Sequence, residues 1–308
     1  MQDSRRFLDP RVLNRIDRLE LKARLVVEGT VAGLHRSPYR GVSVEFAQHR
    51  QYVPGDDVRF LDWKIFARSD RYTIKEFEEE TNLTAHIFLD ASGSMGYSSQ
   101  ETWGDQPAIT KFRYASWVAA ALAHLSLRQR DAVSLVVFDD KVRLAVPPAS
   151  GVNHFDEVIR QIEKTEPASS VTPEKALVAS ANAIHRRGLV VLVSDLLCAA
   201  DEVMQAIRLL RARGNDVIVL RVLDPAEVHS EFEKMTRFDD LEGPTQLLID
   251  PRAIRRAYLD EFHAHDERLR HGCQSQNIDL VRLATDTSLD VGLVAYLGAR
   301  ASRARARA

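Results

Sequence analysis

The sequence predicts an α/β fold, in which helices cover both faces of a doubly wound, mostly parallel sheet. Short, continuously apolar runs, such as AHIFLD at 85–90 and LVVLVSD at 189–195, are typical of strands buried on both faces. Amphipathic helical stretches alternate with such runs through most of the chain. Two of the runs end in an acid, Asp90 and Asp195, at the edge where open parallel sheets usually form their binding sites.

The expected elements follow from hydrophobic periodicity. Besides the two runs above, the expected strands are 132–138, 141–146, 216–224 and 278–283. The expected helices are 111–130, 153–164, 172–187, 201–214, 250–272 and 288–300. The strands 132–138 and 141–146 are separated by only two residues, which predicts an antiparallel hairpin.

Several residues mark the ends of these elements. Gly214 is a stop signal for the helix before it, and Gly272 is expected to end the helix that Asp250 caps and Pro251 opens. A further hairpin is predicted over 236–250, turning near Gly243 and Pro244. We expect it to cover a sheet edge, and the alternative is a projecting docking arm.

The region before the alternating pattern has a different character. It holds one amphipathic helix candidate at 11–25, followed by a polar, glycine-punctuated stretch that indicates strands and loops. We therefore divide the chain into an N-terminal helix and β-rich extension at 1–80, the α/β domain at 81–298, and a basic tail at 299–308 that we expect to be disordered.

Composition narrows the classes of function. A net charge of −2 over 308 residues argues against nucleic-acid binding by the whole chain. Cys198 and Cys273 lie far apart and match no disulfide framework or zinc spacing. The N-terminus lacks the apolar region of a secretion signal, and no run reaches the roughly 18 apolar residues of a membrane span. We therefore expect a cytoplasmic protein.

The spacing Asp90-x-Ser92-x-Ser94 places one carboxylate and two hydroxyls on the turn after a strand. Such oxygens are hard ligands that suit Mg²⁺ or Mn²⁺ rather than zinc. The motif alone equally fits a serine-rich turn, because Asp and Ser are common turn residues. Asp195, at the end of a second strand, favours the metal site because it supplies a second acid at the same edge.

Two enzyme interpretations compete with a binding module. Ser94 in SGSMG resembles a nucleophile elbow, but Ser92 stands where that turn needs glycine. Asp90 could be the nucleophile of a metal-dependent phosphohydrolase, but Ser92 also stands where such enzymes carry a general acid. A non-enzymatic binding module, whose metal takes a carboxylate from a partner, needs neither group, and the phosphohydrolase is the runner-up.

The stretch LDASGSM resembles the metal-ion-dependent adhesion site of von Willebrand factor A domains. Asp90, Ser92 and Ser94 match its first motif, and Asp195 in SDLL matches its later acid. The resemblance implies a threonine between them, which would be Thr172 in SSVTPEKAL; Val171 replaces the usual glycine. Ser169 or Ser170 could substitute for this ligand. The resemblance also implies a strand order of 3-2-1-4-5-6.

The stretch GVSVEFAQHRQYVPGDDVRFLDWKIFARSDRYTIKEFEEE resembles the signature of the bacterial family called domain of unknown function 58. That resemblance extends to about Gly298 and implies an extended segment joined to a von Willebrand A-like domain. It further implies partnership with a MoxR-type AAA+ ATPase in chaperone-like maturation, complex assembly or metal insertion. In this interpretation the chain is an adaptor, and a partner protein supplies an Asp or Glu to the metal.

Overall fold

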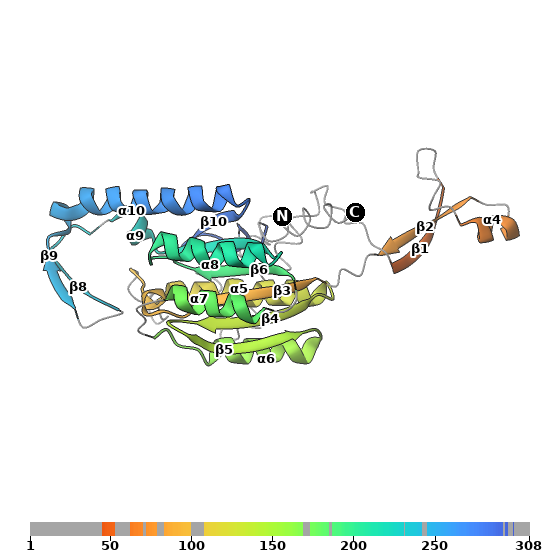
Figure 1. Ribbon diagram of the computed structural model, residues 1–308, viewed down its shortest axis with the longest axis horizontal. Coiled ribbons are helices and arrows are strands. Elements are labelled where there is room, and N and C mark those ends of the chain that lie inside the picture. The colour runs from red at the N-terminus through yellow and green to blue at the C-terminus, as the bar shows by residue number, and fades with distance from the viewer. Residues whose placement is uncertain are drawn as a thin grey trace.

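The computed structural model describes residues 45–52, 62–69, 72–78, 83–99, 108–168, 173–184, 187–230, 232–241, 245–291, 293–294 and 298. Its centre is a six-stranded sheet of order β10-β7-β6-β3-β4-β5, shown in Figure 1. These strands are β3 (Thr84–Asp90), β4 (Ala132–Phe138), β5 (Val142–Ala149), β6 (Leu189–Ser194), β7 (Asp216–Leu223) and β10 (Asp279–Ala284).

The strand order confirms the predicted fold class. Four of the strand pairs in this sheet are parallel, and β5 pairs with β4 in the antiparallel direction, as the predicted hairpin requires. Numbered in chain order within the sheet, the strands run 3-2-1-4-5-6. The order reverses between β3 and β6, which are direct neighbours, so the carboxyl ends of these two strands lie together at the switch point of the sheet.

Helices cover both faces of the sheet. They are α5 (Lys111–Arg128), α6 (Val152–Glu163), α7 (Pro173–Ala183), α8 (Ala200–Ala212) and α10 (Pro251–Ser275). Side chains of β3 alternate between the two sides: Ile87 and Leu89 join the core with α5 and α6, whereas Phe88 joins the core with α7, α8 and α10. Both faces of the central strands are therefore buried, which explains their continuous apolar runs.

Two of the predicted helix boundaries are confirmed and one is wrong. Gly214 follows α8 with a φ of 80°, and Asp250 caps α10 by accepting a hydrogen bond from the backbone N–H of Arg252. Gly272 does not end α10, which continues to Ser275. A Cβ at Gly272 would lie 2.8 Å from Sδ of Met204, so this glycine allows α10 to approach α8 closely.

Two short elements lie between β7 and α10. Helix α9 (Pro225–His229), which periodicity did not predict, begins with a capping box between Asp224 and Glu227. The predicted hairpin follows as β8 (Thr236–Asp239) and β9 (Gln246–Ile249), which form a two-stranded sheet of their own. In the described part of the chain this ribbon pairs with no strand of the six-stranded sheet. It therefore does not extend a sheet edge.

The N-terminal extension is described in part. Strands β1 (Glu45–Gln51) and β2 (Thr73–Glu78) form an antiparallel pair, and α4 (Trp63–Ser69) lies between them in the chain. The predicted helix at 11–25 and the basic tail at 299–308 lie outside the described residues. Across the residues that are described, no helix combines the length and the apolar character that crossing a bilayer requires.

Candidate metal centre

Asp90 is the last residue of β3, and the turn after it gathers the two predicted serines. The Asp90 carboxylate accepts a hydrogen bond from the backbone N–H of Ser92 at 2.8 Å, which folds the chain back at the strand end. A short 3-10 helix, η2 (Gly93–Gly96), then brings the hydroxyl of Ser94 within 3.2 Å of the Ser92 hydroxyl. Asp90 and Ser92 are buried and Ser94 is half-buried, so the turn sets three oxygen-bearing side chains close together at the base of the surface.

Asp195 enters the same site from the neighbouring strand. It follows β6 directly, and Ser194 donates a hydrogen bond from its hydroxyl to the second oxygen of the Asp90 carboxylate. The Asp195 carboxylate accepts from the backbone N–H of Leu197 and interacts with the hydroxyl of Ser94. Leu196 has a φ of 51°, a backbone conformation that costs a non-glycine residue free energy.

Four of the five predicted ligands therefore lie together: Asp90, Ser92, Ser94 and Asp195. The fifth, Thr172, lies outside the described residues, as do its alternatives Ser169 and Ser170. All the gathered donors are carboxylate or hydroxyl oxygens, a set that fits a hard divalent cation. Among the described residues, no three His, Cys, Asp or Glu side chains group where they could hold a metal ion.

Lys111 is a residue of this site that sequence reasoning missed. It is the first residue of α5 and is fully buried, and its Nζ donates to Asp195 at 2.7 Å and to Glu227 at 2.5 Å. Glu227 belongs to the capping box of α9, whose pattern Asp224-Pro225-Ala226-Glu227 is a readable helix start. No local signal distinguishes Lys111 from the surface lysines, because its burial depends on α9 packing beside α5.

The charges in the site are unbalanced toward the acids. Burial and the negative charge of Asp195 raise the pKa of Asp90 to about 7, even though Ser194 and Ser92 donate hydrogen bonds to it. Burial would also raise the pKa of Asp195, but the charge and hydrogen bond of Lys111 outweigh it and lower that pKa. Three acids thus share one ammonium group, and a bound cation would relieve the repulsion that remains.

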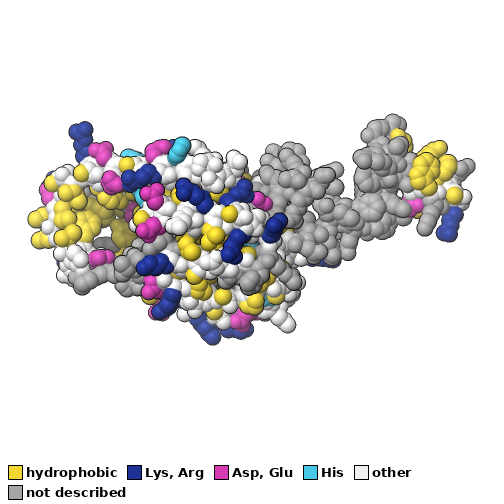
Figure 2. All heavy atoms as spheres, viewed as in Figure 1, with side chains coloured by type: hydrophobic (Ala, Val, Ile, Leu, Met, Phe, Trp, Pro, Cys, Tyr) yellow, Lys and Arg dark blue, Asp and Glu magenta, His cyan; other side chains and the backbone are white. Residues whose placement is uncertain are grey.

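This cluster forms part of the lining of an open cleft of about 750 Å³. The opposite walls come from the loop after β6, the β8–β9 ribbon and the start of α10, and they carry apolar side chains. Those with large exposed fractions are Leu197, Leu241, Leu247, Ile254 and Tyr258. Figure 2 shows hydrophobic side chains gathered at the end of the molecule where β8 and β9 lie, beside a hollow. The site is therefore open to a partner with apolar side chains.

Comparisons with known proteins identify a family and several similar proteins. Residues 48–268 match the family model described as protein of unknown function DUF58. The uncharacterized protein Rv1480 of Mycobacterium tuberculosis is 25% identical over 298 residues, which cover 95% of this chain and 90% of the relative. Two solved structures are similar at low identity. BatB from Bacteroides thetaiotaomicron is 16% identical with a TM-score of 0.46, over 73% of this chain and 100% of that one. The SpRpn10 VWA domain is 11% identical with a TM-score of 0.41, over 70% and 94%.

Proposed function

The chain belongs to the DUF58 family, and from that premise we propose that it is a metal-dependent protein-binding adaptor. One observation carries the proposal: Asp90, Ser92, Ser94 and Asp195 converge at two neighbouring strand ends and open into a cleft with exposed apolar walls. Converging oxygen donors suit a cation, and a contiguous exposed apolar surface is typical of a protein-interaction site. The two features together favour recognition of a protein over chemistry on a small molecule.

In this proposal the four gathered residues, with Thr172 as a fifth ligand, hold Mg²⁺ or Mn²⁺. When bound, the metal supplies a positive, open coordination position that takes an Asp or Glu from the partner. Lys111 positions Asp195, because the ion pair and the backbone N–H of Leu197 fix that carboxylate in place. The apolar cleft walls then bury the partner residues that flank the acid.

We propose a MoxR-type AAA+ ATPase as the partner, in chaperone-like maturation or complex assembly. This assignment rests on the family resemblance, and the acid-accepting cleft is compatible with it. We also propose that the adaptor works in the reducing cytoplasm, a compartment that suits the two free thiols of Cys198 and Cys273.

The metal assignment is tested by calorimetric titration of Mg²⁺ and Mn²⁺ into the wild type and into Asp90→Ala. We expect saturable binding in the wild type that Asp90→Ala abolishes. Asp260→Ala is a matched control, because Asp260 is an exposed acid on α10. Equal binding by all three proteins would remove the metal from the mechanism. Capture of the MoxR-type ATPase with and without EDTA tests the adaptor role, and capture that EDTA leaves unchanged contradicts metal dependence.

A metal-dependent phosphohydrolase is the second candidate, and Lys111 is the observation that favours it. Its ammonium lies beside Asp195, where it could neutralise charge on a phosphoryl group near Asp90. Against it, position 92 carries a serine, which cannot serve as the general acid at neutral pH. Steady turnover of a generic phosphoester that Asp90→Asn abolishes would favour the enzyme over the adaptor.

A further inference from the structure

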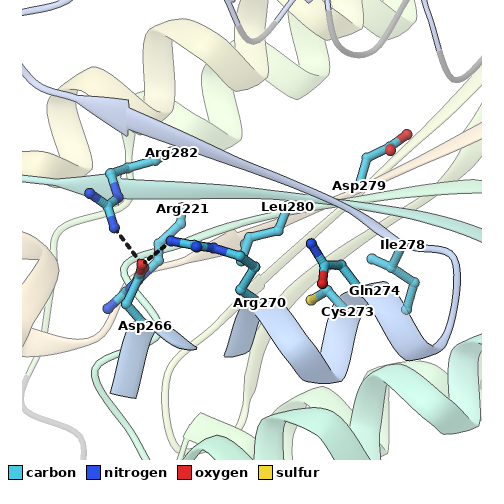
Figure 3. A pocket seen from close by; sticks show the side chains of 9 residues that line it. All are labelled: Arg221, Asp266, Arg270, Cys273, Gln274, Ile278, Asp279, Leu280 and Arg282. Atoms are coloured by element: carbon cyan, nitrogen blue, oxygen red, sulfur yellow. Dashed lines mark hydrogen bonds and ion pairs between the residues drawn. The ribbon is translucent and has the colours of Figure 1, made fainter. Parts of the chain in front are cut away.

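A second polar cavity lies away from the candidate metal centre, between the C-terminal half of α10 and the strands β7 and β10. It has a volume of about 530 Å³, and Figure 3 shows the side chains that line it. They are Arg221, Asp266, Arg270, Cys273, Gln274, Ile278, Asp279, Leu280 and Arg282. None of these residues lines the first cleft, so the cavity needs an explanation of its own.

Three arginines converge on one carboxylate at one end of this cavity. Asp266 accepts hydrogen bonds from Arg221 at 2.7 Å, Arg270 at 3.0 Å and Arg282 at 2.6 Å. The arginines come from three separate elements, β7, α10 and β10, and the dashed lines in Figure 3 mark the pairs of Arg270 and Arg282 with Asp266. The lining of the cavity carries these three arginines against two acids, Asp266 and Asp279, so it keeps an excess of one positive charge.

The innermost arginine carries an unsatisfied donor. The side chain of Arg221 is only 1% exposed, and its guanidinium lies over the ring of Phe262. Its Nε donates to the backbone carbonyl of Asp195 and its Nη1 to Asp266. Within the part of the chain that the structure describes, its buried Nη2 has no hydrogen-bond partner. Asp266 therefore does not saturate the donors of the cluster.

Neighbouring acids do not remove the positive excess. Glu267 pairs with the other terminal nitrogen of Arg270, but its side chain is 65% exposed and its charge is screened by water. Asp279 also lines the cavity, yet Figure 3 shows its carboxylate pointing away from Asp266. The side chains of Arg270 and Arg282 are 49% and 40% exposed, so a ligand in the cavity can reach both guanidinium groups.

The other end of the cavity is less polar. Ile278, Leu280 and Cys273 line it, with the amide of Gln274 beside them in Figure 3. Burial raises the pKa of the Cys273 thiol to about 11, so this residue is a neutral wall and not a nucleophile at neutral pH. The cavity thus joins a cationic end to a less polar end.

We propose that this cavity binds a small phosphomonoester. The phosphate group meets the guanidinium groups of Arg270 and Arg282, and the organic part packs against Ile278 and Leu280. A phosphate group carries the negative charge that the lining leaves unmatched, and planar guanidinium groups bind phosphate oxygens in pairs. The volume exceeds what a bare phosphate ion fills, which is why the ligand has an organic body.

The test is calorimetric titration with phenyl phosphate at constant ionic strength, with inorganic phosphate and phenol as separate arms. We expect saturable binding of one phenyl phosphate, weaker binding of inorganic phosphate and none of phenol. Phosphate that binds as tightly as phenyl phosphate would overturn the assignment of a phosphomonoester. A response that rises with concentration without saturating would overturn the site itself.

Two variants and one control locate the binding. Arg282→Gln and Arg270→Gln are each expected to weaken phenyl phosphate binding by at least about tenfold, because each removes a charge-assisted hydrogen bond. Arg256→Gln, whose side chain is 97% exposed on the same helix, keeps wild-type affinity. Equal weakening in all three variants would reduce the effect to net charge. Asp90→Ala also keeps wild-type affinity, so the outcome does not depend on the candidate metal centre.

Discussion

The structure holds two clusters of charge, each around a buried aspartate, whose imbalances have opposite sign. At the carboxyl ends of β3 and β6, the acids Asp90, Asp195 and Glu227 share the single ammonium group of Lys111. At the inner face of α10, three arginines share the single carboxylate of Asp266. The first cluster lacks positive charge and the second lacks negative charge, so the two are suited to ligands of opposite charge.

The comparison shows that the charges beside a buried aspartate decide whether the effect of burial on its pKa is reinforced or reversed. Burial raises the pKa of both Asp90 and Asp266. Asp195 adds a second negative charge beside Asp90, and the pKa of Asp90 reaches about 7. For Asp266, the hydrogen bond of Arg282 and the charges of the three arginines outweigh burial and lower the pKa. Arg221 joins the clusters, since it contacts Asp266 and the carbonyl of Asp195.

The largest effect is expected from removing the cation that pairs directly with the acid cluster. Lys111→Met removes the direct ion-pair partner of the buried Asp195 and Glu227, and we expect the free energy of unfolding in EDTA to fall by about 4 kcal/mol. Urea denaturation measures this loss. Mg²⁺ should restore part of the stability, since a ligand that binds only the folded state stabilises it. Lys141→Met is the matched control, because Lys141 is exposed. If Lys111→Met is as stable as this control, the acid cluster does not depend on the positive charge of Lys111.

The next prediction is an increase in stability, and it distinguishes the roles of the neighbouring acids Asp90 and Asp195. Asp90→Asn removes a charge that burial and Asp195 disfavour, so in EDTA we expect the variant to be more stable than the wild type by about 2 kcal/mol. Asp195→Asn should instead destabilise, because it leaves the buried Lys111 paired with Glu227 alone. Urea denaturation of both at pH 8 provides the measurement. Two changes of the same sign would show that the acids do not repel each other.

These clusters also mark how far the sequence could predict the structure. Asp90, Ser92, Ser94 and Asp195 could be grouped in advance, because parallel strands bring their carboxyl ends to one edge. The sheet and its helices follow from continuous apolar runs and helical periodicity in the same way. These features depend on local pattern and on a topology that has few alternatives.

The rest depends on packing between segments that are far apart in sequence. Lys111 and Glu227 are 116 residues apart in sequence, and Arg221 and Asp266 are 45 apart. No local sequence pattern therefore predicts either ion pair. Gly272 has the pattern of a helix stop, but its actual role is to let α10 approach Met204 of α8. The sequence shows a glycine in either case, and only the tertiary contact distinguishes a helix stop from a close approach of two helices.

A smaller effect tests the arginine cluster through pH. The pKa of Asp266 is lower in the folded state than its ordinary value of about 3.9, so the carboxylate stabilises the fold fully above that pH. This contribution is lost as the pH falls through the folded-state pKa. We expect Asp266→Asn to reduce the loss of stability between pH 6 and pH 3 by about 1 kcal/mol relative to the wild type, as measured by urea denaturation. Asp260→Asn, at an exposed position, serves as the control and should follow the wild type. If the stability of Asp266→Asn depends on pH in the same way as that of the wild type, the expectation is contradicted.

The smallest effect on stability is expected from variants that test the apolar wall of the cleft beside the acid cluster. Leu247 and Leu248 are neighbours on β9 with exposed fractions of 53% and 67%, but only Leu247 lines the cleft. Side chains alternate along a strand, so the two project from opposite faces of the ribbon. Each Leu→Ser change should alter the free energy of unfolding by no more than about 0.5 kcal/mol. Capture of the MoxR-type ATPase in Mg²⁺ should fall for Leu247→Ser and not for Leu248→Ser. Equal capture by both variants would mean that the partner reaches the acid cluster without using the apolar wall.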